Sequence, residues 1–353
     1  MILHIFNNQK KFSKGYFKML KDHKFDIEGM QLIHYGKEDD YFEKEIGIKT
    51  LFIKSYVSII GNIKMLAKLK AAKKIVVHSL ASPALLLYLT FSKKLQKKVV
   101  WVIWGKDLYF TKLLKKKKFY HSIYEWFRVR SIKHIGTIVT ILQGDYDRLV
   151  KWYDVSGKHI VCNDLYHYAV DTEIKEPKDI EKEKKIILLG NSGSVTNRHI
   201  DALNKLKNCC NIDKIYCPLS YGGNEKYYGK VIEYGKQIFG EKFVPLTDFM
   251  EKSEYEKMLD SVDVGVFNYN RQEGLGNIWL LMFMGKTIYL NSNTSTGEFF
   301  DEINVEYIDF ENGLNNNEMQ VLDKNSLVKN QRELSEKINI QCSVEKWREI
   351  LYE

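Results

Sequence analysis

A polar loop with two glycines carries the first residues that could do chemistry. In the stretch LLGNSGSVTNRH, residues 188–199, a helical pattern begins only after Gly190, Asn191, Ser192 and Gly193. Glycine lets a ligand approach the backbone closely, and small polar side chains supply hydrogen-bond donors without bulk. Where such a loop opens a helix, the unpaired N–H groups and the positive end of the helix dipole favour an anion. The loop therefore predicts a phosphate site.

A second loop of the same kind precedes a strongly apolar helix. The stretch FNYNRQEGLGNIWLLMFMGKTIYLN, residues 267–291, places Arg271 and Gln272 between a strand and that helix. A guanidinium can clamp a diphosphate with two parallel hydrogen bonds, and the backbone N–H groups from Gly274 to Asn277 can bind a second anion or sugar hydroxyls. Two such loops in one domain favour a nucleoside diphosphate.

Each loop also has a plainer interpretation. The first would be an ordinary strand-to-helix turn capped by Ser194 or Thr196, and Arg271 would form a surface ion pair with a neighbouring carboxylate. The pattern GNSG lacks the third glycine of G-x-G-x-x-G, and no G-K-S/T of a Walker A loop follows. The loops alone leave both interpretations open.

The elements that must position these loops alternate between strands and helices. In the first half, apolar runs such as ILHIF, KIVVHS and GTIVTIL alternate with helical patterns such as PALLLYLTFSKKL. The alternation restarts at KKIILLG, continues with a helix from about Thr196, and includes DKIYCPL, VDVGVFNY and KTIYLN. Such a pattern predicts an α/β protein with two Rossmann-like domains, whose parallel sheets face a cleft with the carboxyl ends of their strands.

The domain limits follow from shifts in composition. We expect an N-terminal domain at 1–170, a charged linker at 171–185 and a C-terminal domain at 186–335. The segment 336–353 is expected to form a helix that packs back on the N-terminal domain.

Several features exclude other classes of protein. The five cysteines are odd in number and show no C-x-x-C spacing, which fits a reducing cytoplasm. The N-terminal MILHIF reads as a first strand and not as a signal peptide, and the longest apolar stretches fall short of the about 20 residues that cross a bilayer. We expect no metal, because helix N-termini and Arg or Lys can neutralise the charge of a leaving diphosphate.

The net charge is concentrated in one half of the chain. Residues 1–170 carry 31 Lys and Arg against 14 Asp and Glu, whereas the rest carries 23 against 31. The basic half is interleaved with aromatic residues, most densely around Lys115, Lys116, Lys117, Lys118 and Trp126. Such a surface fits an anionic membrane, where each nearby Lys or Arg contributes about 1 kcal/mol, or nucleic-acid phosphates.

Two residues of the first half are candidates for the general base. Asp107 lies in WGKDLY, just after a strand, and His78 ends the strand KIVVHS. Both positions fall where an α/β sheet presents its active-site side. Alternatively, Asp107 is an N-cap for the following helix, and His78 is a buried histidine with satisfied hydrogen bonds.

Five blocks of the sequence together resemble a known family. The blocks HSLASPALLL, WVIWGKDLY, ILLGNSGSVTNRHIDAL, CPLSYGGNEKYYGKVIEYG and FNYNRQEGLGNIWLLMFMGKTIYLN occur in order, and the chain resembles the family 56 glycosyltransferases. Those enzymes transfer 4-acetamido-4,6-dideoxygalactose (Fuc4NAc) to a polyprenyl-diphosphate-linked oligosaccharide of enterobacterial common antigen. The resemblance implies a GT-B fold, a nucleotide-sugar donor of the TDP or UDP type in the C-terminal domain, and a lipid-linked acceptor at the N-terminal domain on the cytoplasmic face of the membrane.

The resemblance also assigns residues to the donor. Its motifs match Gly190, Asn191, Ser192, Gly193, Asn197, His199, Tyr221, Arg271, Gln272, Gly274 and Gly276 of this sequence. For His199 a polar position on a half-exposed helix face is the alternative, and Tyr221 would stack on or hydrogen-bond to the nucleotide. Glu273 replaces a glutamine of the enterobacterial pattern, which leaves the exact donor sugar open.

Two other functions remain compatible with the sequence. A nucleic-acid-binding protein would use the basic half and would not need the glycine loops. A sugar-nucleotide epimerase of GT-B shape would bind the same donor without an acceptor. The ordered motifs favour a glycosyltransferase that binds no nucleic acid.

Overall fold

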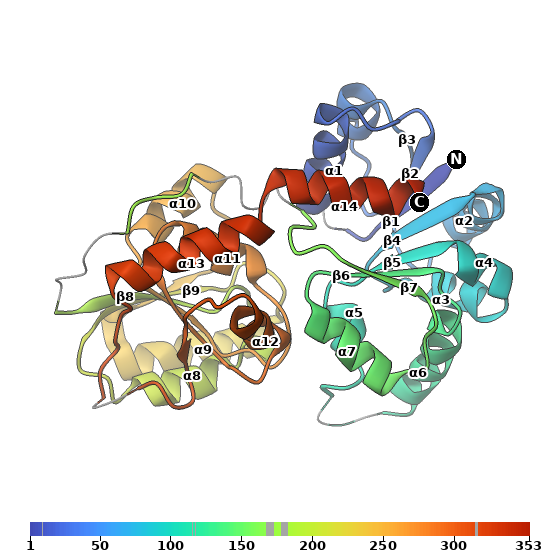
Figure 1. Cartoon of the computed structure of the whole chain (residues 1–353). Coiled ribbons are helices and arrows are strands. Elements are labelled where there is room, and N and C mark those ends of the chain that lie inside the picture. The colour runs from blue at the N-terminus through green and yellow to red at the C-terminus, as the bar shows by residue number, and fades with distance from the viewer. Residues whose placement is uncertain (9, 115, 117, 167–172, 178–182, 315–316) are drawn as a thin grey trace. The chain divides into compact units, whose positions relative to one another are not determined.

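The computed structural model describes the chain except residues 9, 115, 117, 167–172, 178–182 and 315–316 (Figure 1). The chain forms two compact units. The first consists of Met1–Ala169 with Lys337–Glu353, and the second of Val170–Glu336. Part of the predicted linker, 171–185, lies outside the described residues.

The first unit is built on a seven-stranded parallel sheet in the order β3-β2-β1-β4-β5-β6-β7. Its strands are β1 (Ile2–Phe6), β2 (Met30–Tyr35), β3 (Lys49–Ile53), β4 (Lys74–His78), β5 (Val99–Val102), β6 (Thr137–Thr140) and β7 (Lys158–Val161). The central strands are nearly continuous apolar runs because helices cover both faces of a parallel sheet. Edge strand β3 was not predicted, since Lys49 and Thr50 lead it and most of it is half-buried.

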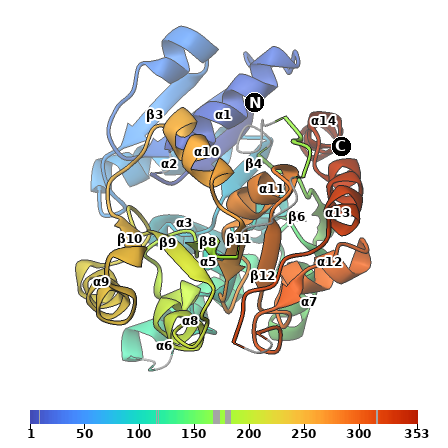
Figure 2. The same ribbon diagram turned by 90° about the vertical axis from the view of Figure 1, so that its left-hand side faces the viewer.

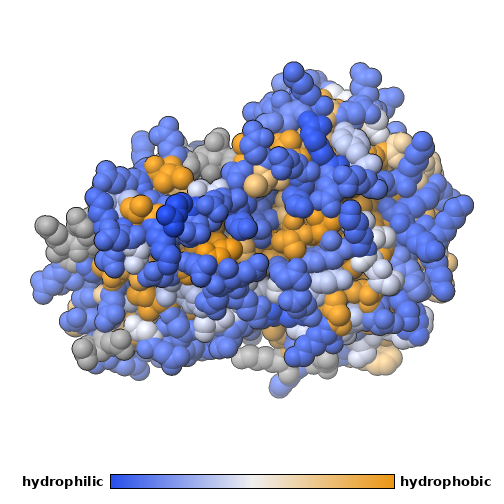
Figure 3. Space-filling view, viewed as in Figure 1, coloured by the Kyte–Doolittle hydropathy of each residue, from blue (hydrophilic) through white to orange (hydrophobic). Residues whose placement is uncertain are grey.

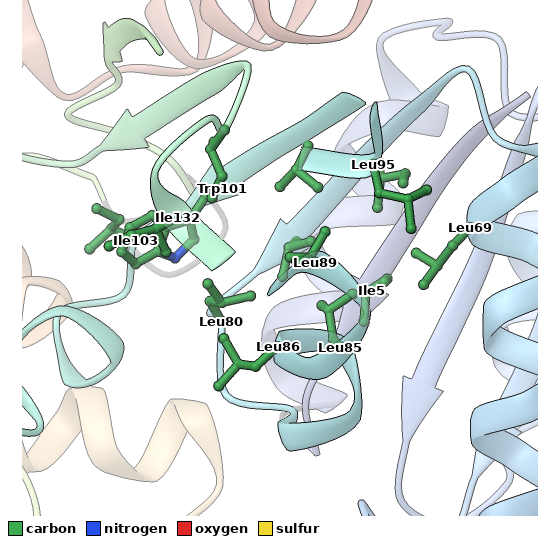
Figure 4. Packing of buried hydrophobic residues seen from close by; sticks show 14 of the residues in the cluster. Ile5, Leu69, Leu80, Leu85, Leu86, Leu89, Leu95, Trp101, Ile103 and Ile132 are labelled. Carbon is green, nitrogen blue, oxygen red and sulfur yellow. The ribbon is translucent and has the colours of Figure 1, made fainter. Parts of the chain in front are cut away.

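Helices cover both faces of this sheet. They are α1 (Lys10–Asp22), the short π-helical turn η1 (Phe42–Ile46), α2 (Ile59–Ala71), α3 (Pro83–Thr90), α4 (Lys93–Lys98), α5 (Lys106–Tyr109), α6 (Phe119–Ile132), α7 (Gln143–Trp152) and α14 (Ile340–Tyr352). Figure 4 shows leucines of α3 in one cluster with Trp101 and Ile132. The single helix expected over PALLLYLTFSKKL is two helices, because the Ser92 hydroxyl accepts from the Leu95 N–H at 3.2 Å and starts α4.

The C-terminal helix α14 packs on this first unit. Trp347 is fully buried, its indole N–H donates to the Leu165 carbonyl at 2.9 Å, and its ring lies 4.6 Å from that of Tyr16 on α1. Figure 1 accordingly shows α14 beside α1.

The second unit repeats the same topology with six parallel strands in the order β10-β9-β8-β11-β12-β13. They are β8 (Lys185–Leu189), β9 (Ile212–Pro218), β10 (Phe243–Leu246), β11 (Val264–Phe267), β12 (Thr287–Leu290) and β13 (Ile308–Asp309). Strands β10 and β13 were not predicted, because Pro245 interrupts the apolar run of β10 and β13 has only two residues. In both sheets the order in which strands are added reverses beside the first strand, β1 or β8. The carboxyl ends of the strands at such a point are where α/β proteins bind ligands.

The helices of the second unit again lie on both sides of the sheet. They are the 3₁₀ turn η3 (Val195–Asn197), α8 (His199–Leu206), α9 (Glu225–Phe239), the 3₁₀ turn η4 (Gly240–Lys242), α10 (Lys252–Asp260), α11 (Leu275–Phe283), α12 (Ser295–Glu302) and α13 (Lys324–Lys337). Figure 2 shows α8 and α9 next to each other. The helix expected from Thr196 begins at His199, because Arg198 has a left-handed φ of 53° that no α-helix contains.

The surface seen in Figure 3 is mostly hydrophilic, with apolar side chains showing in small groups. In the part of the chain that the structure describes, no helix is long and apolar enough to cross a membrane.

Candidate functional site

The glycine loop after β8 is closely packed. Gly190 has a φ of 72°, which favours glycine, and a Cβ atom there would lie 2.8 Å from Asn197 Oδ1 and 2.9 Å from His199 Nε2. Gly193 packs against the turn after β9, where a Cβ on Gly223 would lie 2.0 Å from the Gly193 carbonyl oxygen. The first contact explains the glycine at position 190 and the second the glycine at position 223, while a Cβ on Gly193 would lie 3.2 Å from the Leu219 carbonyl oxygen.

Three backbone N–H groups of this loop form hydrogen bonds within the second unit. Those of Gly190 and Gly193 donate to the carbonyls of Val266 and Tyr221 at 2.8 and 2.7 Å, and that of Asn191 donates to Asn197 Oδ1 at 3.1 Å. These three N–H groups are therefore already paired, and a phosphate at this loop would have to bind other donors. The predicted capping by Ser194 or Thr196 is absent, since no side chain caps η3 or α8.

The Asn197 side chain links two residues of the loop. Besides accepting from the Asn191 N–H, its amide donates to Ser192 Oγ at 3.2 Å, so both ends of the buried side chain are used. Asn191 differs from it. Its Nδ2 lies 3.4 Å from the Tyr221 hydroxyl, but its buried Oδ1 has no hydrogen-bond partner among the described residues.

His199 is fully buried, so the half-exposed alternative is wrong. Burial lowers the pKa of His199 to about 4, and the ring is neutral at pH 7. The Tyr227 oxygen accepts from the His199 backbone N–H at 3.3 Å and lies 3.1 Å from Nδ1. Assigning the phenol proton to Nδ1 places the ring proton on Nε2. That Nε2 has no partner in the described chain and points toward Gly190.

The second predicted loop lies against the first. The Asn270 N–H donates to the Thr196 carbonyl at 3.3 Å. Gly274, with a φ of 73°, comes so close to Asn191 that an added Cβ would lie 3.0 Å from the Asn191 Cβ. The structure thus brings the two sequence-predicted loops together at the carboxyl ends of neighbouring strands β8 and β11.

Arg271 is buried and already ion-paired. Its guanidinium donates to Glu273 Oε2 at 2.7 Å and to the Gln272 carbonyl at 2.9 Å. The neighbouring carboxylate was foreseen as an alternative, but the pair is not on the surface, since Arg271 is 9% and Glu273 7% exposed. A diphosphate at Arg271 must therefore compete with Glu273 or share the guanidinium with it.

Asn268 was missed in the sequence. It follows β11 directly and is 1% exposed, and neither its Oδ1 nor its Nδ2 has a hydrogen-bond partner among the described residues. The sequence feature that could have identified Asn268 is its position directly after an apolar strand, three residues before Arg271 of the predicted loop.

Four residues of this region have buried polar atoms without a hydrogen-bond partner in the described chain. Besides Asn268, these are Asn191, His199 and Gln272, whose Oε1 is also buried without a partner in the described chain. All four side chains come from β8, β11 and the segments that follow them. Because burying an unpaired polar group costs about 1–3 kcal/mol, such a gathering indicates groups kept for a ligand.

The first turn of α11 completes the edge. The Asn277 N–H donates to the Gly274 carbonyl at 2.9 Å, so it is not available as expected, while Gly276 lies within the first turn, whose N–H groups point out of the helix. The phenol of Tyr255 on α10 hydrogen-bonds the Asn277 side chain, and burial raises its pKa. Tyr221 is 56% exposed, and its hydroxyl lies beside the Asn191 side chain.

In the first unit, Asp107 lies inside α5 and does not cap it. Its Oδ2 accepts from the Trp101 indole N–H at 2.8 Å and the Leu80 N–H at 2.9 Å, and its Oδ1 accepts from the Trp104 N–H at 3.0 Å. These bonds tie together the turns that follow β4 and β5. About one of the four lone-pair positions of the carboxylate remains for another donor.

His78 matches its structural alternative. It is fully buried, its Nδ1 lies 2.5 Å from the Tyr166 hydroxyl, and its Nε2 lies 3.4 Å from His4 Nδ1. Burial, together with the neighbouring His4, lowers the pKa of His78 well below its usual value. The Phe6 ring stacks on it with the centroids 3.6 Å apart.

Comparison with known proteins decides the family. A family model described as 4-alpha-L-fucosyltransferase, glycosyl transferase group 56, matches residues 26–351. The chain belongs to glycosyltransferase family 56. The resemblance stated from the motifs is thereby confirmed, and the protein is a glycosyltransferase of bacterial surface polysaccharide synthesis, in a family that transfers Fuc4NAc.

Solved structures show the fold of this family 56 transferase. HepE of Anabaena in complex with UDP-glucose is 10% identical, with 99% of this chain and 98% of that chain covered and a TM-score of 0.70. A glycosyltransferase from Rickettsia africae is 13% identical over 99% and 98%, with a TM-score of 0.64. The lipopolysaccharide outer core galactosyltransferase WaaB is 11% identical over 100% and 97%, with a TM-score of 0.55. The predicted GT-B fold of two Rossmann-like units is confirmed.

The membrane-facing residues predicted for the transferase are described only in part. Lys115 and Lys117 lie outside the described residues, whereas Lys116 is exposed and Lys118 precedes α6. Trp126 on α6 is 45% exposed, and the Arg130 guanidinium lies 3.8 Å from its ring. Within the described chain, no three His, Cys, Asp or Glu side chains are grouped so as to hold a metal ion.

Proposed function

We propose that the second unit of this transferase binds a nucleoside diphosphate sugar of the TDP or UDP type at the carboxyl ends of β8 and β11. The observation that carries the proposal is the set of buried, unpartnered polar atoms on Asn191, His199, Asn268 and Gln272. A sugar nucleotide offers many hydroxyl, carbonyl and phosphate groups to such donors and acceptors.

Positive potential at this site serves the leaving diphosphate. Charge develops on the diphosphate as the glycosidic bond to it breaks, and a fixed cation and a helix N-terminus stabilise such charge. Arg271 and the first turn of α11 are adjacent in sequence and supply both. We assign Asn191, His199 and Asn268 to the sugar and phosphate oxygens, and the exposed ring of Tyr221 to the base.

The first unit would hold the acceptor, a polyprenyl-diphosphate-linked glycan at the cytoplasmic face of the membrane. Asp107 stays our candidate for general base, because its carboxylate is oriented by three N–H groups and retains one acceptor position. His78 comes second, since its lowered pKa and its two occupied nitrogens disfavour proton uptake.

A thermal-shift series tests the donor site. We expect one of TDP, UDP and GDP to raise the melting temperature, and a short DNA duplex to have no effect. Substituting Arg271→Ala should abolish the shift, but it also removes the cation beside the buried Glu273 carboxylate and destabilises the fold. The paired variant Arg271→Ala/Glu273→Gln removes both charges and keeps the result interpretable.

Two results would overturn the proposal. One is the absence of any shift with all three diphosphates while the wild-type protein is folded. The other is an undiminished shift in the paired variant, together with one in Tyr221→Ala. Salt-sensitive stabilisation by DNA would point to the basic half as a nucleic-acid surface instead.

A further inference from the structure

Helix α2 carries apolar side chains on two sides. Gly61, Met65 and Leu69 face the core at a spacing of four residues. Ile59, Ile60 and Ile63 lie outside that stripe and are 76%, 71% and 62% exposed. Single exposed apolar residues are ordinary, but a helix with a second apolar stripe indicates a surface that another phase or partner covers.

The neighbouring helix extends this stripe. Tyr88 of α3 donates its hydroxyl proton to the Asn62 carbonyl of α2 at 3.1 Å, which joins the two helices. On the outer side of α3, Leu87 and Phe91 are 43% and 74% exposed. They line a groove of about 560 Å³ with Leu66 of α2 and with lysines from α2 and α4. We call these outer residues of α2, α3 and α4 the α2–α3 face.

The charge around this face has one sign. Residues 46–106 contain twelve lysines and no aspartate, glutamate or arginine. Among them, Lys64, Lys70 and Lys94 are exposed on α2 and α4. Apolar side chains that project from a lysine-rich surface are the combination that binds an anionic bilayer, where the chains enter the interface and the ammonium groups meet the headgroups.

We propose that the α2–α3 face docks the transferase on an anionic phospholipid membrane. The proposal rests on the proposed function, in which the acceptor is linked to a lipid, and it adds a surface that the basic segment near Lys116 and Trp126 does not include. Nucleic acid would use the lysines but would gain nothing from exposed isoleucines. A second copy of this face would bring lysines against lysines.

The face continues toward the aromatic residues of α6. The hydroxyl of Thr90 at the end of α3 lies 2.8 Å from the Leu86 carbonyl and 3.0 Å from the Phe127 carbonyl of α6, so α3 contacts both α2 and α6. On α6, Phe119 is 82% exposed and Trp126 45%. Aromatic side chains favour the interface of a bilayer, and α6 can therefore form one rim of the docked surface.

Vesicle cosedimentation tests the docking. We expect the protein to bind phosphatidylcholine vesicles containing about 30% phosphatidylglycerol and to leave them at about 0.5 M salt only in part, because apolar contact survives screening. The triple variant Ile59→Ser/Ile63→Ser/Phe91→Ser should bind at least about tenfold more weakly. The control Phe249→Ser removes an equally exposed phenylalanine, since Phe91 and Phe249 are both 74% exposed, and it should bind like wild type.

The outcomes separate this inference from the donor site. Equal binding by the triple variant and wild type would overturn the docking face, as would a wild-type protein that binds a nucleoside diphosphate but no vesicle. Light scattering adds a third test, because a wild-type dimer that the triple variant converts to monomer would identify the face as an interface between copies. A transferase that binds vesicles through this face but no nucleotide would refute the donor site alone.

Discussion

Two buried histidines, one in each unit, differ in their hydrogen bonds. His78 in the first unit and His199 in the second are both fully buried near the carboxyl end of a strand. Both nitrogens of His78 have hydrogen-bond partners, whereas His199 Nε2 has none among the described residues. Asp107 of the first unit and Asn268 of the second differ in the same way, since Asp107 accepts three N–H bonds and Asn268 makes none among the described residues.

The difference separates polar groups that are paired within the fold from groups that the proposed donor would pair. The hydrogen bonds of Asp107 and His78 fix turns of the first unit, and removing them weakens the fold, although His4 Nε2, the Tyr16 hydroxyl and His34 Nδ1 of that unit are also buried without a partner among the described residues. Unpartnered groups reduce stability until a ligand pairs with them, so they persist where binding requires them. The following experiments test that division, in order of decreasing effect.

Acid should weaken the first unit most. Burial lowers the pKa of His4 to about 3 and that of His34 to about 4, and the pKa of His78 lies well below its usual value. Between about pH 6.5 and 4 these histidines are therefore protonated in the unfolded chain but neutral in the folded one. The stability they contribute is fully present above about pH 6.5 and falls as the pH drops toward 4. His4 and His34 each contribute a loss of up to about 3 kcal/mol by pH 4.

Tryptophan fluorescence can follow this loss in the first unit. Trp101, Trp104, Trp126, Trp152 and Trp347 lie there, and only Trp279 lies in the second. Hydrogen exchange reports the second unit, where His199 is the histidine with a lowered pKa among the described residues. If acid opened the second unit first, the assignment of the first unit's histidines as buried neutral groups would fail.

Replacing Asp107 should have the next largest effect. The change Asp107→Ala leaves three N–H groups, those of Trp101, Leu80 and Trp104, without their carboxylate acceptor, and we expect a loss of about 4 kcal/mol in urea unfolding. The exposed Asp154, paired with Lys133, is the control, and Asp154→Ala should change stability by less than about 0.5 kcal/mol. Unchanged stability in Asp107→Ala would reduce its role to chemistry alone.

Glycine substitutions probe the packing of the second unit's loop. In Gly190→Ala, a left-handed φ and contacts of 2.8 and 2.9 Å act together, and we expect a loss of about 3 kcal/mol. Gly47 has a φ of 86° but nothing within 4 Å of an added Cβ, so Gly47→Ala should lose only about 1 kcal/mol. Equal losses in thermal unfolding would mean that the loop can relax and that its close packing is unimportant.

The sequence predicted the meeting of the two loops better than it predicted their contacts. Apolar runs placed β8 and β11, and two loops after parallel strands had to meet at one edge of the sheet. Which N–H groups stay available depends on contacts between distant segments, such as Gly193 with Tyr221 or Asn270 with Thr196. The ion pair of Arg271 was only one of two interpretations, and Asn268 could not be distinguished from any polar residue that ends a strand.

The sharpest test compares two asparagines of the second unit. Asn197 and Asn268 are 2% and 1% exposed, but only Asn197 uses both ends of its amide. Replacing Asn197→Leu should cost about 2 kcal/mol, whereas Asn268→Leu removes an unpaired amide and should raise the free energy of unfolding by about 1 kcal/mol.

Ligand binding should reverse the advantage of the second variant. If Asn268 is kept for the donor, Asn268→Leu should weaken nucleoside diphosphate or sugar-nucleotide binding by about tenfold in calorimetry, because a lost hydrogen bond in a buried site is worth about 1.4 kcal/mol. A variant that gains stability and keeps full affinity would show that the unpaired amide does not serve the donor. One that loses stability would show that Asn268 is a structural group like those of the first unit.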